Sequence, residues 1–443
     1  MLLVRGNMLV RAAACAGAGL LGGTRRCSAL SASPSAAPEG YELLHVSCYF
    51  RHGARTPLFG LDTPVVQGHA WDGCAASARL SAGIDSGVDD VVRLRGRGTA
   101  AAPPPSMVDA KQRETVLPGG GRAGELTAVG LAQAEGLGRR LRSRYAARLG
   151  ADDPAFWADR VEARTTHVAR CALTLRGVLV GLGASGPVDA DAAHASEETL
   201  TPNLRRCDRL NAFWQELRAQ RRAAPPPDKG PVVDSLLKKV PADSGFDFPV
   251  LNVPLKDALI ALASEGGALP WGLDVDELQA LDDLAAAEVA TLLGVGVDDA
   301  DQAAVLRLGA GPLVAELRAA LAAAAASETP TLRLMSGHDT TVKPLLVALD
   351  MYDHKWPPFC ACVALEVYKT PHGRAVRVLY DGATAGACYG APTDFYVALD
   401  FEDLDSFLAK LSAVALEGAA WSRACAAGSG VPVGDAAAGG GSF

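Results

Sequence analysis

The chain has 443 residues, of which 49% are hydrophobic and 21% are charged, and its formal net charge is −8. This length and composition predict a globular protein with one large α/β body or two to three domains. The negative charge argues against a general affinity for nucleic acid or for anionic membranes, so any site for an anionic substrate must be built from local positive groups.

Two further classes are disfavoured by the sequence. No run of 18 strongly apolar residues occurs, so we expect no transmembrane segment. The ten cysteines are scattered and form no CxxC pair, which argues against a zinc site of the usual spacing. Cys360 and Cys362 alternate along an expected strand and are predicted to be buried thiols, whereas the disulfide state of the eight cysteines after the N-terminal segment stays open.

Residues 1–38 are expected to be a targeting presequence. They contain no Asp or Glu and carry several Ser together with Arg5, Arg11, Arg25 and Arg26. This composition is typical of a mitochondrial transit peptide. The alternative is a secretory signal, with residues 12–23 as its apolar region.

The apolar residues that follow predict a strand over 42–50, which ends directly at Arg51-His52-Gly53-Ala54-Arg55-Thr56-Pro57. A second apolar strand is expected over 331–336, and it ends at Gly337-His338-Asp339. Ligands of open α/β sheets bind beyond the carboxyl ends of the strands. Both motifs are therefore placed where a site is expected.

The other elements are expected in chain order from apolar periodicity and capping residues. Residues 80–122 and 183–230 are rich in small, polar and Pro residues and are predicted to be irregular. The expected regular elements are a helix over 126–149 with Thr127 as N-cap, a strand over 161–165, a helix over 168–182, several helices over 231–327, a hairpin over 360–368 and 375–380, and a helix over 401–415.

Together these elements predict an α/β fold, a three-layer body whose mostly parallel central sheet is flanked by helices, with an inserted and mostly helical cap. The expected boundaries are a presequence at 1–38, a discontinuous body at 40–185 and 328–420 with a loop excursion at 80–122, a cap at 186–327 and a flexible tail at 421–443.

His52 is the expected nucleophile. A neutral imidazole can attack phosphorus and carry the phosphoryl group covalently, and the positive charges of Arg51 and Arg55 favour the neutral form. Arginine side chains match phosphate oxygens with paired hydrogen bonds, each worth about 1.5–3 kcal/mol. The alternative is a structural histidine beside solvated arginines. The position at a strand end favours the catalytic interpretation.

Asp339 is the expected proton donor. A leaving alkoxide needs a proton, and a nearby carboxylic acid that supplies it accelerates cleavage by about 10²–10⁴-fold. Asp339 would start protonated and then act as base on the attacking water, while His338 would add a donor to the phosphate oxygens. The alternative is that Asp339 only caps the helix that follows it.

Arg170 falls in the first turn of the helix that follows the strand at 161–165. Helix N-termini favour anions, so this side chain could complete a phosphate pocket. The alternative is an ordinary solvated helix charge.

These motifs resemble those of the histidine phosphatases, in their histidine acid phosphatase branch. The resemblance covers roughly residues 41–415 and also includes Gly124-Glu125-Leu126-Thr127 with Gly130 and Gln133, the run 137–145, Trp356-Pro357-Pro358-Phe359, and the stretch 164–170 with Arg176. The last two groups are similar to the mitochondrial lysophosphatidic acid phosphatases of that branch. The resemblance implies a catalytic pair of His52 and Asp339. It implies phosphate binding by Arg51, Arg55, Arg170 and His338, and neither a metal nor another cofactor.

The function expected from the residues and the resemblance is hydrolysis of a small or lipid phosphate monoester, such as lysophosphatidic acid, through a phosphohistidine. We expect a monomer with no nucleic-acid partner. Two alternatives stay open. One is a phytase-like phosphatase, for which the expected cap supplies Arg218, Arg221, Arg222, Lys229, Lys238 and Lys239. The other is a non-catalytic protein that binds phosphate or phospholipid.

Overall fold

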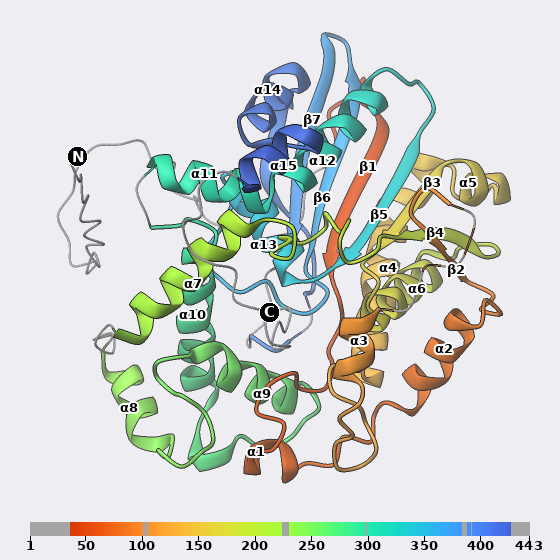
Figure 1. Cartoon of the computed structure of the whole chain (residues 1–443). Coiled ribbons are helices and arrows are strands. Elements are labelled where there is room, and N and C mark those ends of the chain that lie inside the picture. The colour runs from red at the N-terminus through yellow and green to blue at the C-terminus, as the bar shows by residue number, and fades with distance from the viewer. Residues whose placement is uncertain are drawn as a thin grey trace, which may run out of the picture.

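The computed structural model describes residues 36–99, 101, 103, 106–223, 230–296, 299–382, 388–390 and 392–426. Within them an eight-stranded mixed sheet has the order β2-β4-β3-β5-β1-β6-β7-β8 (Figure 1). The parallel strands are β2 (Val92–Gly96), β4 (Val188–Ala192), β3 (Val161–Thr165), β5 (Thr331–Gly337) and β1 (Glu42–Arg51). The antiparallel strands are β6 (Cys362–Thr370), β7 (Gly373–Asp381) and β8 (Tyr396–Asp403).

Strand β1 lies where the sheet changes from parallel to antiparallel, since it pairs with β5 on one side and with β6 on the other. Every residue of β1 after Glu42 is buried. Continuous burial of this kind is expected for a strand that is covered on both faces. The predicted α/β class with a helix-flanked sheet is therefore confirmed.

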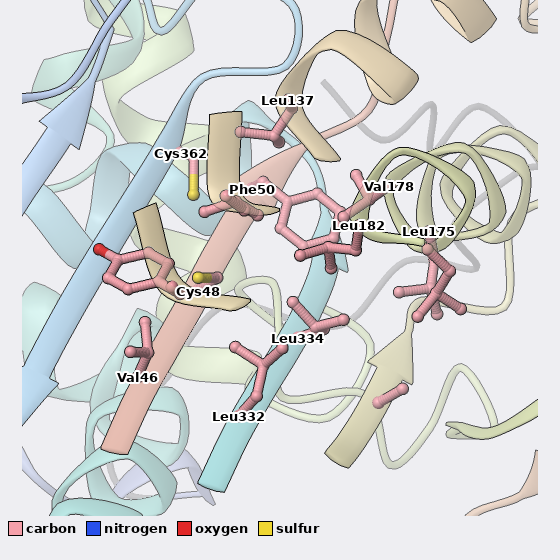
Figure 2. Packing of buried hydrophobic residues seen from close by; sticks show 14 of the residues in the cluster. Val46, Cys48, Phe50, Leu137, Leu175, Val178, Leu182, Leu332, Leu334 and Cys362 are labelled. Carbon is pink, nitrogen blue, oxygen red and sulfur yellow. The ribbon is translucent and has the colours of Figure 1, made fainter. Parts of the chain in front are cut away.

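Helices cover both faces of the sheet. On one face α4 (Ala128–Leu149) and α6 (Ala169–Leu182) pack with the shorter helices α2 (Ala75–Asp85) and α5 (Pro154–Asp159). Val46, Cys48 and Phe50, alternate residues of β1, point toward this layer (Figure 2). Tyr49 points to the opposite face, which is covered by α12 (Gly311–Ala325), α13 (Asp339–Ala348) and α14 (Leu404–Val414).

The helix after β3 thus lies on one face and the helix after β5 on the other, because residues of α6 and α13 belong to the two different cores. In an open α/β sheet this change of face opens a crevice at the carboxyl ends of the strands, where ligands bind. This rule predicts a site between the ends of β3, β5 and β1, and that place is called the crevice below.

A group of helices packs beyond one end of the sheet (Figure 1). It comprises α1 (Pro64–Gln67), α8 (Pro231–Lys239), α9 (Asn252–Ser264) and α10 (Val275–Thr291), which share a core that includes Leu236, Leu259 and Leu278. The same core includes Ala54 of the loop after β1. These helices are called the cap below, and their core joins them to the loop that carries His52.

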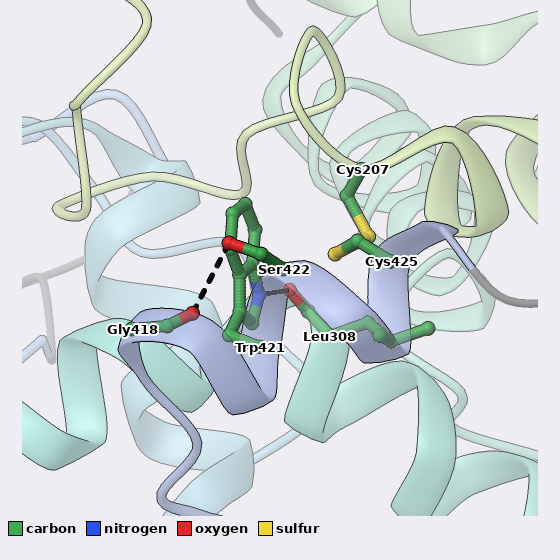
Figure 3. The surroundings of a disulfide bond; sticks show 6 residues. All are labelled: Cys207, Leu308, Gly418, Trp421, Ser422 and Cys425. Atoms are coloured by element: carbon green, nitrogen blue, oxygen red, sulfur yellow. Dashed lines mark hydrogen bonds between the residues drawn. A yellow bond between two sulfur atoms is a disulfide. The ribbon is translucent and has the colours of Figure 1, made fainter.

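A further small core joins α7 (Asp208–Ala223), α11 (Asp299–Gly309) and α15 (Gly418–Ala426). A disulfide between Cys207 and Cys425 links the residue before α7 to α15, and the indole of Trp421 donates to the carbonyl of Leu308 (Figure 3). Cys360 and Cys362 are free and buried, as predicted.

Several boundaries differ from the prediction. The segment 80–122 is not irregular throughout, because it contains the end of α2, strand β2 and α3 (Met107–Gln112). The segment 183–230 contains β4 and α7. In β4 the buried side chains are Val188 and two alanines, which alternate with aspartates and give a weak apolar signal.

The predicted cap range 186–327 was too wide, since β4 is part of the sheet and α12 packs on it. The last predicted helix begins at Leu404 because 401–403 belong to β8, and the predicted tail at 421–443 contains the part of α15 (Gly418–Ala426) from Trp421 onward. The predicted presequence, apart from residues 36–38, and the rest of the tail lie outside the described residues.

No single helix among the described residues is long and apolar enough to span a membrane. Two consecutive helices, Gln302–Gly309 and Gly311–Ala325, reach the required length and apolar composition only when they are counted together, and the chain bends by 69° between them.

Candidate active site

The two predicted loops meet because β1 and β5 are parallel neighbours. Arg51 lies opposite Gly337 in their register, so the chains leave the sheet side by side. The backbone N–H of His52 donates to the carbonyl of Gly337 at 2.9 Å. The imidazole rings of His52 and His338 stand 5.4 Å apart, centroid to centroid. Two residues almost three hundred positions apart in the sequence therefore share one crevice.

The tautomer of His52 follows from its hydrogen bond. Nδ1 lies 2.8 Å from the carbonyl oxygen of Gly53, and because a carbonyl only accepts, Nδ1 carries the proton. Nε2 then holds the lone pair. This is the arrangement that a nucleophilic imidazole requires.

The loop after β1 is fixed against the helices beside it. The N–H of Gly53 donates to the Thr174 hydroxyl at 3.1 Å, and that of Ala54 donates to Oε1 of Gln133 at 2.8 Å. A Cβ at position 53 would clash with the carbonyl of Gly130, so only glycine allows the loop to approach α4 this closely. Gly53 therefore contributes to the orientation of His52 through packing.

His52 is neutral at neutral pH. Its ring is buried, and burial together with the guanidinium groups of Arg170, Arg51 and Arg55 holds the pKa of His52 well below its usual value. The sequence predicted the influence of Arg51 and Arg55. Arg170 is the guanidinium with the largest influence on His52.

Arg51, Arg55 and Arg170 are all buried around this ring, and each is held by a different segment. Arg51 donates from Nη1 to the carbonyl of Pro357 at 2.7 Å. Arg55 donates to both carboxylate oxygens of Asp257, at 2.7 and 3.4 Å. Arg170, the second residue of α6, donates to Oε1 of Gln112 at 3.3 Å.

In each of these three arginines the buried Nε has no hydrogen-bond partner among the described residues. A buried donor without an acceptor costs about 1–3 kcal/mol, and more when the group is charged. Three such donors around one histidine form an environment that an anion with several acceptor oxygens would stabilise.

Asp339 is the first residue of α13, and His338 occupies the N-cap position. Its Oδ2 accepts from the indole N–H of Trp356 at 3.0 Å and lies 3.3 Å from Nη2 of Arg51. Its Oδ1 accepts from the backbone N–H of Thr340 at 2.8 Å. Asp339 thus accepts a hydrogen bond within the first turn of α13, although His338 and not Asp339 is the N-cap, and it lies beside Arg51 at the crevice.

Although burial alone would raise it, the pKa of Asp339 is lowered below its usual value by the positive charges of Arg51, Lys256 and Lys343. In the protein without a bound anion the carboxylate form is therefore favoured, and the expected protonated start of the reaction depends on the charge of the bound phosphate. A phosphate beside Asp339 would add negative charge and raise its pKa again.

His338 lies between Asp339 and the N-terminus of α6. Its Nε2 is 3.0 Å from the Thr166 hydroxyl, and the thiol of Cys171 lies 3.6 Å from the same nitrogen. Burial and the charge of Arg170 lower the pKa of His338 well below its usual value. The ring is therefore neutral and has one N–H to donate.

All six predicted site residues are thus brought to one crevice. Sequence reasoning missed the side chains that hold them, Gln112 and Asp257, and it quoted Trp356 without giving it a site role. An acidic residue on a predicted apolar helix face, as at Asp257, is the signal that could have drawn attention to that position.

The family model of the histidine phosphatase superfamily (branch 2) matches residues 42–242 and 274–381. The chain belongs to this superfamily. Among curated histidine phosphatases, it is 30% identical over 371 residues to lysophosphatidic acid phosphatase type 6 of Bos taurus, covering 77% of this chain and 78% of the bovine protein. The human protein of that name is likewise 30% identical over 356 residues, covering 77% and 78% of the two chains. Prostatic acid phosphatase of Rattus norvegicus is 27% identical over 288 residues, covering 60% of this chain and 72% of the rat protein.

Solved phytase structures share the fold. The apo phytase of Hafnia alvei superposes with a TM-score of 0.56 at 15% identity, covering 88% of this chain and 99% of the phytase. At this identity the likeness shows the fold alone. Membership of the superfamily and the acid phosphatase relatives show that the chain is a phosphoric monoester hydrolase.

Proposed function

We propose that this histidine phosphatase hydrolyses a small or lipid phosphate monoester through a phosphohistidine formed on Nε2 of His52. The observation that carries the proposal is the 2.8 Å hydrogen bond from Nδ1 of His52 to the Gly53 carbonyl. It leaves Nε2 with its lone pair inside a ring of three buried arginines.

In the first step the Nε2 lone pair forms a bond to phosphorus while the bond from phosphorus to the ester oxygen breaks. The leaving oxygen takes the proton of the Asp339 carboxyl. In the second step a water oxygen attacks phosphorus, its proton passes to the Asp339 carboxylate, and the bond from Nε2 to phosphorus breaks. The arginines stabilise the charge on the phosphoryl oxygens in both steps.

The proposed substrate class is lysophosphatidic acid and similar lipid monoesters, because the relatives that share 30% identity over most of both chains bear that name. The phytase-like alternative needs a basic cap surface. Of the lysines considered for it, Lys239 is already bound to Glu277 at 2.8 Å. Arg221, Arg222 and Lys229 lie outside the described side chains. No contact of the described residues favours an inositol phosphate.

Single-turnover mixing with p-nitrophenyl phosphate tests the chemistry. We expect a burst of nitrophenol that EDTA does not change, and no burst from the His52→Ala variant. His194→Ala is the matched control, because His194 is an exposed histidine, and it should retain the burst. Saturable phosphate binding without any turnover would instead support the non-catalytic alternative.

The substrate is tested by comparing kcat/KM for lysophosphatidic acid, inositol hexakisphosphate and glucose 6-phosphate. The proposal requires the lipid monoester to have the highest value. A higher value for the inositol phosphate would replace it with the phytase-like function.

We also propose that residues 1–38 direct the chain to a mitochondrion, with the secretory pathway as the alternative. The Cys207–Cys425 disulfide favours an oxidising compartment, which the secretory pathway of the alternative provides. Imaging of a fluorescent fusion with and without residues 1–38 tests this assignment. Cytosolic fluorescence from the full-length fusion would contradict both destinations.

A further inference from the structure

Trp356 contacts two buried lysines, one from the cap and one from the body. The Lys256 ammonium, on α9, is 3.6 Å from the centroid of its ring, and the Lys343 ammonium, on α13, is 4.0 Å from the same centroid. Both distances are within the range of a cation–π interaction. One indole therefore faces two positive charges.

The indole is also directly bonded to the expected proton donor, since its N–H donates to Oδ2 of Asp339 at 3.0 Å. Positive charges on the ring draw electron density from it and make the N–H a stronger donor to the carboxylate. Trp356 therefore connects the two lysines to the group that must protonate the leaving oxygen.

The two lysines differ in whether a carboxylate is bonded to their ammonium group. Lys256 is paired with the buried carboxylate of Asp282 on α10, at 3.2 Å. The buried Nζ of Lys343 has no hydrogen-bond partner among the described residues. Burial lowers the pKa of Lys343 to about 7, helped by the charges of Lys256 and Arg51 and opposed by the carboxylates of Asp339 and Asp282.

We propose that Lys343 is a positioning residue that acts on Asp339, directly by its charge and through Trp356, and confines proton donation by Asp339 to acid pH. This inference rests on the proposed function. Lys343 forms and breaks no bond in the reaction. Its charge favours the carboxylate form of Asp339, so the fraction of enzyme that holds the reacting proton falls at a lower pH than it would beside a neutral side chain.

The test compares the pH profiles of kcat/KM for wild type and Lys343→Met on two substrates. Glycerol 3-phosphate has an alkoxide leaving group and needs the proton, whereas p-nitrophenyl phosphate needs it far less. For glycerol 3-phosphate we expect the basic limb of the variant to move upward by about 1 pH unit. At a pH above the wild-type limb this corresponds to a gain of up to about tenfold. The limb for the aryl ester should move by less than half as far.

Lys355→Met is the matched control. It removes the same charge from the residue next to Trp356, but Lys355 is half exposed and paired with Asp283 at 2.8 Å. Its basic limb should coincide with that of wild type. A Lys343→Met limb that also coincides with wild type, or a limb that moves to lower pH, would overturn the inference.

The variant is expected to fold, because removing an ammonium without an acceptor leaves no partner unpaired. Since the folded pKa of Lys343 is lowered, its ammonium opposes folding fully below pH 7 and less as the pH rises toward 10. Lys343→Met should therefore melt at a higher temperature than wild type at pH 6. Lys343→Leu provides a second version, and if neither variant folds, the premise that the ammonium is dispensable is wrong.

The outcomes separate this inference from the proposed function. Absence of turnover by the wild type on both esters would contradict the proposed function. Normal wild-type turnover with an unmoved limb in the variant would contradict only the role of Lys343.

Discussion

Asp257 of cap helix α9 holds Arg55 of the loop after β1 with both of its carboxylate oxygens, at 2.7 and 3.4 Å from the guanidinium. The same carboxylate accepts the backbone N–H of Leu58 at 2.8 Å. One cap side chain therefore fixes both Arg55 and the loop that carries it. This joins the cap directly to the loop of His52.

Asp257→Asn should destabilise the protein. It leaves the Arg55 guanidinium buried without a counter-ion, which typically costs about 3 kcal/mol. Inorganic phosphate would supply the missing negative charge. Thermal melting at pH 7 should therefore show a lower Tm than wild type and a larger rise in Tm on addition of phosphate.

The difference in Tm between wild type and Asp257→Asn should depend on pH. Despite burial, Arg55 lowers the pKa of Asp257, so the pair stabilises the fold above the unfolded pKa of about 4 and loses that effect as the pH falls through the folded pKa. The Tm difference between wild type and Asp257→Asn should shrink below pH 4. A difference that stays constant from pH 7 to pH 3 would contradict the ion pair as its cause.

Asp339→Asn should separate substrates by leaving group. An amide cannot donate the proton, so turnover of glycerol 3-phosphate should fall by about 10²–10⁴-fold. Turnover of p-nitrophenyl phosphate, which leaves as a stable anion, should fall much less. Steady-state kcat on the two esters measures this, and equal losses on both would remove Asp339 from the role of acid.

The sequence predicts the site residues that follow strands, but not the residues that hold them in place. His52 and Asp339 could be found because each follows an apolar strand directly, and strand ends of a parallel sheet meet at one edge. Asp257 could not be found, since it is 202 residues from Arg55 and helical periodicity shows which face is buried but not which distant side chain faces it. Gln112 escaped because its helix lies in a segment whose Gly and Pro content predicts irregular chain.

The fold divides in the same way. Strands β1 and β5 are rich in large apolar residues and were predicted within a residue of their observed ends. Strand β4 was missed because small alanines and aspartates replace the usual β-branched residues. Strand β8 was missed because it lies at the sheet edge, where most of its side chains are only half buried.

Arg170→Met should change both phosphate binding and the pH profile. The loss of a charge-assisted contact should raise KM for p-nitrophenyl phosphate by about tenfold or more. After burial, Arg170 has the largest effect in lowering the pKa of His52. Its removal should raise that pKa, so His52 becomes protonated and inactive at a higher pH, and the acid limb of the profile should move upward.

Arg176→Met is the control for Arg170, because Arg176 lies on the same helix and pairs with Asp89 at 2.7 Å, outside the crevice. Its KM and acid limb should match those of wild type. An acid limb in Arg170→Met that does not move would show that this guanidinium does not control the charge of His52.

The Cys207–Cys425 disulfide should stabilise the protein without taking part in the reaction. It closes a loop with a sequence separation of 218 residues and links α15 to the start of α7, in a core separate from the crevice (Figure 3). Native disulfides commonly contribute about 2–5 kcal/mol. The Cys207→Ser/Cys425→Ser double variant should therefore melt at a lower temperature, while its kcat on p-nitrophenyl phosphate at 25 °C should stay within about twofold of wild type.

Dithiothreitol should lower the Tm of wild type toward that of the double variant. It should leave the Tm of the variant unchanged, since the other described cysteines are free thiols. A wild-type Tm that does not respond to reductant under denaturing preincubation would contradict a stabilising disulfide.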